Sequence, residues 1–186
     1  MDKYVLIAGV NGSGKSTLYQ TLYSLHDMPR VNTDEIVRSF GTWNNASDLI
    51  KASKQAIRMV SNYLDNHITF NQETTLCGRS ILNNIKKAKN LGYFIEMYYI
   101  GVSGADTAIE RVKKRVNSGG HGIPSDDIRR RYIESLNNLV ALIPICDRIF
   151  LYDNEIDFKM FAFYRNGKLE KLGEFPDWFL SVYKQC

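Results

Sequence analysis

The residues with the clearest chemical purpose in this chain form a glycine-rich segment near its start, residues 9–17. The segment reads Gly-Val-Asn-Gly-Ser-Gly-Lys-Ser-Thr, which has the Walker A spacing of a glycine, four residues, a glycine, a lysine and a serine. Glycines allow backbone conformations that other residues avoid, so successive N–H groups can face one concavity and hold phosphates. The nucleotide-binding residues predicted from this motif are Gly9, Asn11, Gly12, Ser13, Gly14, Lys15, Ser16 and Thr17.

Lys15 and Ser16 have separate expected roles in such a segment. The ammonium group of Lys15 reaches the β- and γ-phosphates, and the hydroxyl of Ser16 is a ligand for Mg²⁺. The alternative is an ordinary glycine-rich turn. Against it, an apolar, β-branched run at residues 4–8 precedes the motif, and leucines at helical spacing follow it. The order of strand, loop and helix therefore predicts a site for a nucleoside triphosphate, which we take to be ATP with Mg²⁺.

Acidic side chains follow two further predicted strands, at the edge of the sheet where the phosphates are expected. Asp34 is the candidate general base for an acceptor hydroxyl, and the alternative is a helix-starting acid stabilised by the macrodipole. Glu73 and Thr74 suit a polyhydroxylated substrate, although an exposed loop explains them equally well. Arg79 comes shortly after and is expected to meet a second phosphate group.

A basic segment supplies the positive charge that phosphoryl transfer requires. Arg115 lies at the edge of the apolar face of a predicted helix, and three arginines at residues 129–131 begin the next helix. Cations are disfavoured at a helix N-terminus unless an anion is nearby, so at least one of the three is expected to reach the site. We take Arg130 as the catalytic candidate, and the sequence does not rank the three. His121, in the glycine loop between the helices, is expected to support phosphate contacts. Residues 111–131 are thus predicted to form a mobile lid; the alternative is a solvated basic face.

The remaining pattern predicts one α/β domain over residues 1–186. It has a P-loop NTPase fold with a mainly parallel sheet, helices on both faces, a C-terminal β-hairpin and a short final helix. The expected strands lie at residues 4–8, 30–32, 68–70, 93–102 and 147–153, and the expected hairpin strands at 158–164 and 168–172, joined through an Asn-Gly turn.

Composition limits the classes of function. The chain of 186 residues has a net charge of +4, no apolar run near the ~20 residues of a membrane helix, and no interleaved aromatic and basic stripe for nucleic acid. Its three cysteines, Cys77, Cys146 and Cys186, are widely spaced, which favours reduced thiols and no zinc site. The chain starts on a core strand, so no signal peptide is expected. We therefore expect a cytoplasmic protein that acts on a small molecule, without a membrane or nucleic-acid partner.

Several segments together resemble the zeta-toxin family of P-loop kinases, most closely its short stand-alone members. They are residues 9–17, 31–34 (Val-Asn-Thr-Asp), 73–78 (Glu-Thr-Thr-Leu-Cys-Gly), 111–124 and 128–139, within a resemblance that runs from about residue 3 to residue 153. The resemblance implies an ATP-dependent kinase of UDP-N-acetylglucosamine that acts on its 3′-hydroxyl, poisons peptidoglycan synthesis and has an antitoxin partner.

The resemblance also implies roles for individual residues. Asp34 matches the catalytic base of the family, Lys15 its phosphate-binding lysine and Arg111 the first of its lid arginines. The second lid arginine has no direct counterpart, and Arg115 and the cluster at 129–131 take its place. The chain lacks the long C-terminal extension of the classical toxins, so other acceptors stay open. The alternatives are a kinase of a nucleoside or an antibiotic, and an ATP-binding regulatory switch with little turnover.

Overall fold

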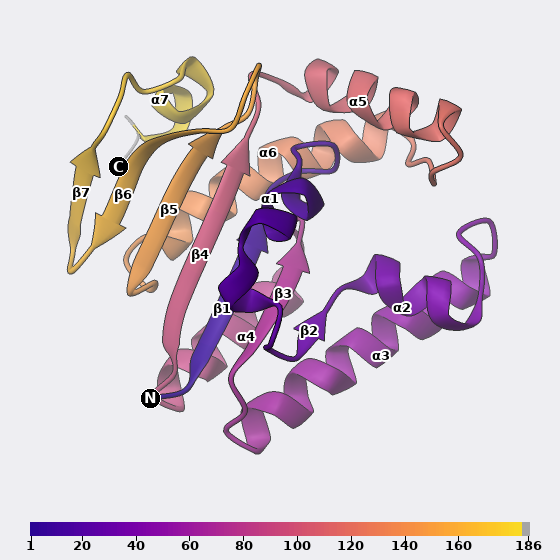
Figure 1. Ribbon diagram of the computed structural model, residues 1–186, viewed down its shortest axis with the longest axis horizontal. Helices are drawn as coiled ribbons and strands as arrows, with labels where there is room; N and C mark the ends of the chain where they lie inside the picture. Colours follow the sequence, from indigo (N-terminus) through magenta and orange to yellow (C-terminus); the bar gives the residue numbers. More distant parts are fainter. Residues whose placement is uncertain (184–186) are drawn as a thin grey trace.

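The computed structural model describes residues 1–183, which form a seven-stranded sheet with helices packed on it (Figure 1). The strands are β1 (Lys3–Ala8), β2 (Arg30–Val31), β3 (Phe70–Thr74), β4 (Phe94–Gly101), β5 (Arg148–Asp153), β6 (Lys159–Arg165) and β7 (Lys168–Lys171). The helices are α1 (Lys15–Thr21), the short 3₁₀ turn η1 (Tyr23–Leu25), α2 (Thr33–Phe40), α3 (Ala46–Asp65), α4 (Arg79–Asn90), α5 (Ala105–Asn117), α6 (Ser125–Leu142) and α7 (Asp177–Tyr183).

The sheet order is β2-β3-β1-β4-β5-β6-β7, with the first five strands parallel and β6 and β7 antiparallel. The strand that carries the glycine-rich loop, β1, is therefore central. Ligands of such sheets bind at the carboxyl ends of the strands. The loops that leave β1, β2 and β3 all lie at that edge, so the α/β P-loop fold predicted from the sequence is confirmed.

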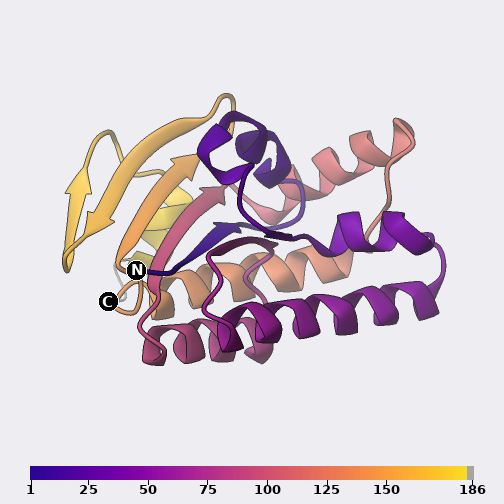
Figure 2. The same cartoon turned by 60° about the horizontal axis from the view of Figure 1, so that its bottom comes forward.

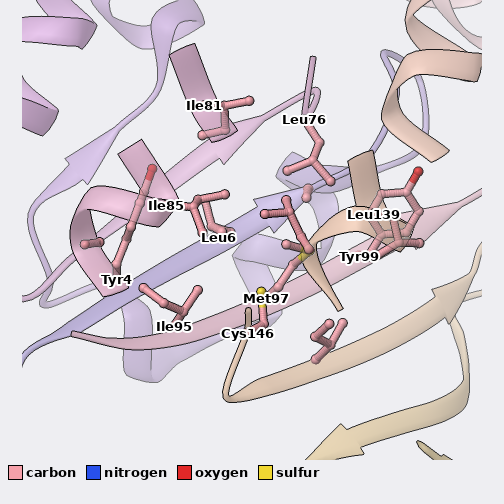
Figure 3. Close-up of a cluster of buried hydrophobic side chains, with 14 of the residues drawn as sticks. Tyr4, Leu6, Leu76, Ile81, Ile85, Ile95, Met97, Tyr99, Leu139 and Cys146 are labelled. Carbon is pink, nitrogen blue, oxygen red and sulfur yellow. The ribbon is translucent and has the colours of Figure 1, made fainter. Parts of the chain in front are cut away.

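Alternating residues of β1 supply two cores. Tyr4 and Leu6 face α3, α4, α6 and α7, and Figure 3 shows them against Ile85 of α4, with Leu139 of α6 in the same cluster. Val5 faces the opposite side, in the smaller core that α1 and η1 cover. Figure 2 shows this asymmetry, with α3, α4 and α6 beneath the sheet and α1 above it. Helices thus cover both faces, but unequally.

The third strand differs from its predicted bounds. The sequence placed a strand at residues 68–70 and a polar loop after it, whereas β3 runs from Phe70 to Thr74. Its backbone pairs with β1 from Tyr4↔Phe70 to Ala8↔Thr74, and this pairing does not depend on side-chain polarity. The amide of Asn71 in β3 donates to the backbone oxygen of Leu25, so a buried polar residue is satisfied where a loop was expected.

The C-terminal elements follow their local signals. Asn166 and Gly167, both at positive φ of 53° and 77°, join β6 to β7 as a type I′ turn requires. Within residues 1–183, the helices include none that is both long enough and apolar enough to cross a membrane. Cys77 and Cys146 are free thiols, and Cys186 lies outside the described residues.

Candidate active site

The glycine-rich loop between β1 and α1 has the conformation that its sequence predicts. Gly9, Gly12 and Gly14 take positive φ values of 144°, 82° and 101°. A side chain would also clash, since a Cβ on Gly9 would lie 2.3 Å from the oxygen of Ile100 and one on Gly14 2.5 Å from Nδ2 of Asn154. The cradle therefore needs glycine for its backbone and for its packing, and its N–H groups lie at the start of α1, where a phosphate is stabilised.

Asn154, which sequence reasoning did not single out, fixes the far side of this loop. Its buried amide donates to the backbone oxygen of Ser13 over 2.8 Å. It lies directly after β5, which the sequence predicted as a strand at residues 147–153. A single asparagine at a strand end carries no sequence signal for a contact 141 residues away.

A cleft of about 880 Å³ opens at this edge of the sheet and is lined by the glycine-rich loop, the starts of α2 and α3, the end of β3, and the facing parts of α5 and α6. The predicted site residues that line it are Asn11, Gly12, Gly14, Lys15, Ser16, Thr17, Asp34, Glu73, Thr74, Arg111, Arg115 and Arg130. Gly9 and Ser13 are buried within the loop itself, and Arg79 is exposed on α4 and does not line the cleft.

Lys15 is 8% exposed, and its Nζ donates to the oxygen of Val10 over 3.1 Å. Burial lowers the pKa of this ammonium, and the nearby charges of Glu73 and Asp34 oppose that effect. An ammonium has three donors, and within residues 1–183 Val10 is its one hydrogen-bond partner. The other donors are therefore available to an anion in the cleft.

Asp34 is the second residue of α2, and Asn32 caps the helix by accepting from the Asp34 N–H at 2.8 Å. The residue is a helix-starting acid, as the alternative interpretation of the sequence predicted, and it also lines the cleft, so its role as a general base stays a prediction. Burial, and then the charge of Glu73, raise the pKa of Asp34. The neighbouring Glu35 instead accepts from Arg30 and does not line the cleft.

Glu73 is held between Ser16 and Arg30. Its carboxylate accepts from Ser16 Oγ at 2.9 Å, from Arg30 Nη2 at 2.7 Å and from Asn32 Nδ2 at 3.1 Å. Arg30 also stacks on the ring of Tyr19, with its guanidinium carbon 3.5 Å from the ring centroid. Sequence reasoning found Glu73 but missed Arg30, because a lone arginine in a two-residue strand has no pattern around it.

The contact between Ser16 and Glu73 bears on metal binding. A hydroxyl oxygen and a carboxylate side by side are ligands that Mg²⁺ accepts beside phosphate oxygens. The residues present therefore fit the ion that the motif implies.

The segment between α5 and α6 closes over the cleft through His121. The imidazole stacks on Trp43 with ring centroids 3.8 Å apart, and its Nε2 and backbone oxygen accept from Arg115 Nη2 at 3.2 and 2.9 Å. Burial and the charge of Arg115 lower the pKa of His121 to about 4, so the ring is neutral at pH 7. Its 3.7 Å approach to Asp34 is therefore not an ion pair at that pH.

The arginines of the basic segment are not equivalent. Arg115 is partly desolvated, which lowers its pKa, and its buried Nε has no hydrogen-bond partner within the described chain. Arg131 donates to Oδ1 of Asn11 in the glycine-rich loop over 3.1 Å. Arg130, named from the sequence, has a side chain that is 60% exposed and pairs with two acids of its own helix. Arg111 lines the cleft and donates to a backbone oxygen in the loop after β5.

Comparisons with known proteins agree with this geometry. The sequence profile of a family described as "AAA domain" matches residues 5–130. An uncharacterized protein of Haemophilus influenzae is 34% identical over 131 residues, which are 70% of this chain and 93% of that protein.

Two groups of solved structures share the fold. The AvrRxo1-ORF1:AvrRxo1-ORF2 complex, with sulphate ions or with ATP, has a chain that superposes at TM-scores of 0.74 and 0.73 with 14% and 15% identity. The superposition covers all of the present chain, which spans only 63% of the length of the matching chain in that complex. The PezAT toxin-antitoxin system of Streptococcus pneumoniae superposes at 0.59 with 14% identity, over all of this chain and 83% of that one. These comparisons support a P-loop domain and do not assign the chain to the zeta toxins specifically.

Proposed function

The chain belongs to the AAA domain family of P-loop proteins, and from that premise we propose that it is a kinase that transfers the γ-phosphoryl group of ATP to a hydroxyl of a small acceptor. One observation carries the proposal. A carboxylate, Asp34, shares a cleft with the ammonium of Lys15 and the guanidinium of Arg115. The charge of Asp34 raises the pKa values of both cations, and their charges oppose the rise in its own pKa. Phosphoryl transfer requires this combination of an acceptor-activating acid and cations around the phosphates.

ATP and Mg²⁺ are accommodated by residues already described. The glycine cradle and Lys15 would hold the phosphates, and Ser16 and Glu73 would hold the ion. When bound, Mg²⁺ would supply positive charge that neutralises the charge developing on the phosphoryl group. Arg30 keeps Glu73 oriented and compensates its charge. A chain with the same fold has been crystallised in a complex with ATP, which supports this nucleotide.

Asp34 would act as the general base. Its raised pKa makes the carboxylate a better proton acceptor than an exposed aspartate. Arg115 and Arg131 would stabilise the transferred group, since both reach the cleft from the helices that face the glycine-rich loop. Residues 111–131 would form the lid, with Gly119 at a φ of 85° in its loop.

Three kinds of acceptor are proposed. UDP-N-acetylglucosamine is the compound nominated by the zeta-toxin resemblance, and nucleosides and antibiotic hydroxyls are the other candidates.

A protein partner is also proposed, because the AvrRxo1 and PezAT structures were both described as assemblies with a second protein.

The test is a metabolite pool incubated with the protein, Mg²⁺ and ATP, followed by mass spectrometry for compounds that gain one phosphate. We expect at least one such product. Lys15→Ala should abolish its formation and weaken ATP binding, because a cation that faces two phosphates is lost. Unchanged turnover in this variant would refute the site. ATP binding without any phosphorylated product would instead favour the regulatory switch.

A further inference from the structure

The cleft has two chemically different sides. Among residues 1–183, the positively charged side chains that line it all come from the glycine-rich loop, α5 or α6: Lys15, Arg111, Arg115, Arg130 and Arg131. These elements border the space assigned above to the triphosphate. The opposite side is formed by α2, the loop after it, α3 and the end of β3. The acceptor has to bind on that second side, because Asp34 projects from it.

The second side presents groups that recognise hydroxyls. Thr33, Ser53 and Thr75 line it, and each offers a hydroxyl that donates and accepts. Trp43 and Leu49 add apolar surface next to them. A few convergent polar groups on an apolar wall are typical of a site for a small, ring-shaped or branched molecule.

The uncompensated charge on this side is negative. Asp34 lines it, and within residues 1–183 no lysine or arginine forms an ion pair with its carboxylate. Glu73 also lines it, but Arg30 compensates that charge, and the two α6 acids of the cleft are paired with Arg130. Burial and the charge of Glu73 raise the pKa of Asp34. A phosphate bound here would therefore meet the carboxylate of Asp34.

The arginines carried by β2, α2 and α4 do not offer a free donor to an acceptor phosphate in the cleft. Arg30 donates from all three of its nitrogens, to Glu35, Asn71 and Glu73. Arg38 in the last turn of α2 is exposed and, within residues 1–183, lies outside the lining of the cleft. Arg79, which the sequence suggested as a second phosphate contact, is exposed and outside it as well.

We propose that the acceptor is a hydroxyl-rich compound without a phosphate group, bound between the α2–α3 side of the cleft and the end of β3. This inference rests on the proposed kinase function. It narrows the acceptor to free sugars, polyols and nucleosides, and it argues against sugar phosphates, nucleotides and nucleotide sugars.

The test uses matched pairs that differ in phosphate: N-acetylglucosamine with its 1-phosphate and UDP derivative, ribose with ribose 5-phosphate, and uridine with UMP. The acceptor found in the metabolite screen forms a further pair with its phosphorylated or dephosphorylated counterpart, and each member is assayed separately. We expect kcat/KM for the phosphate-free member to exceed that of its partner by at least ~10-fold, because like charges repel strongly in a partly buried cleft. A phosphorylated member that is used equally well or better overturns the inference.

A substitution on the acceptor side gives a second, independent measurement. Ser53 is exposed on α3 and lines the cleft, so a longer side chain fits there without disturbing the core. Ser53→Lys should shift the preference toward phosphorylated members by ~10-fold, whereas the uncharged Ser53→Gln should not. An equal effect of both variants would show that bulk, not charge, sets the preference, and would count against the inference.

Binding without turnover separates this inference from the kinase proposal. Calorimetry with the same pairs is performed on protein saturated with a non-hydrolysable ATP analogue and Mg²⁺. Tighter binding of the phosphate-free members supports the charge argument even if no compound is phosphorylated. In that case it is the kinase proposal that fails. Tighter binding of the phosphorylated members overturns the charge argument whether or not turnover is seen.

Discussion

Replacing Asp34 by asparagine separates the proposed chemistry from folding and binding. The substitution keeps the size of the side chain and the helix cap, in which the backbone N–H of residue 34 donates to Asn32. It removes one negative charge from the cleft. The loss of a helix-starting acid costs about 0.3–1 kcal/mol at most. Against this, the folded protein disfavours the charge, because burial and Glu73 raise the pKa of Asp34.

The sign of the stability change follows from that direction. A carboxylate whose pKa is raised in the folded state destabilises the protein in the pH range where it is ionised, above its folded pKa. Neutral asparagine removes this penalty. We therefore expect the melting temperature of Asp34→Asn at pH 7 to be equal to or above that of the parent protein.

The rate should behave differently. General bases contribute ~10²–10⁴-fold, and a loss of ~10²-fold in kcat corresponds to about 2.7 kcal/mol of transition-state stabilisation. ATP affinity should stay within about tenfold, since Lys15 and the glycine cradle are unchanged. In the parent protein kcat/KM should rise with pH as Asp34 ionises, with an inflection above the usual 3.8 because its pKa is raised. This inflection should be missing in the variant.

The assay measures phosphorylated product at several pH values, with ATP binding followed separately by calorimetry. Glu35→Gln is the matched control, because it makes the same chemical change one residue later on a side chain that lies outside the cleft lining. Its rate should fall by no more than a few fold. If Asp34→Asn keeps its rate and loses only ATP binding, Asp34 is a metal or structural residue and the base lies elsewhere.

Two further predictions follow from contacts that only the structure shows. Arg131→Ala should lower kcat by at least ~10-fold in the same kinase assay, because Arg131 contacts the glycine-rich loop. Arg130→Ala should lower kcat much less, because Arg130 is exposed. The reverse order would mean that the solvent-facing Arg130 moves onto the phosphates during turnover. Gly101→Ala should lower the free energy of unfolding by about 1–3 kcal/mol in thermal or urea unfolding, since its Cβ would lie 2.2 Å from the ring of Trp178. Gly104→Ala is the control, because its Cβ would meet no atom nearer than 4.0 Å, and the free energy of unfolding should change little.

The sequence alone predicted the features that depend on local chemistry. The glycine-rich loop is specified by backbone conformations that three glycines allow, so Lys15 and Ser16 could be placed without a structure. The turn at Asn166-Gly167 likewise follows from residues next to one another. Asp34 was identified because a strand end followed by a helix start is visible in the pattern.

The tertiary structure decided which side chains meet across distant segments. It brings Arg131 into contact with Asn11 of the glycine-rich loop, because the orientation of α6 is fixed by packing along its whole length, and three consecutive arginines give no hint of that rotation. Arg79 lies outside the cleft because the packing of α4 fixes the direction of its exposed side chains. The pairing of Arg30 with Glu73 depends on β2 lying beside β3, a neighbour relation that no local periodicity encodes. Sheet order and helix rotation come from the global packing of apolar faces, and they determine which charges share a site.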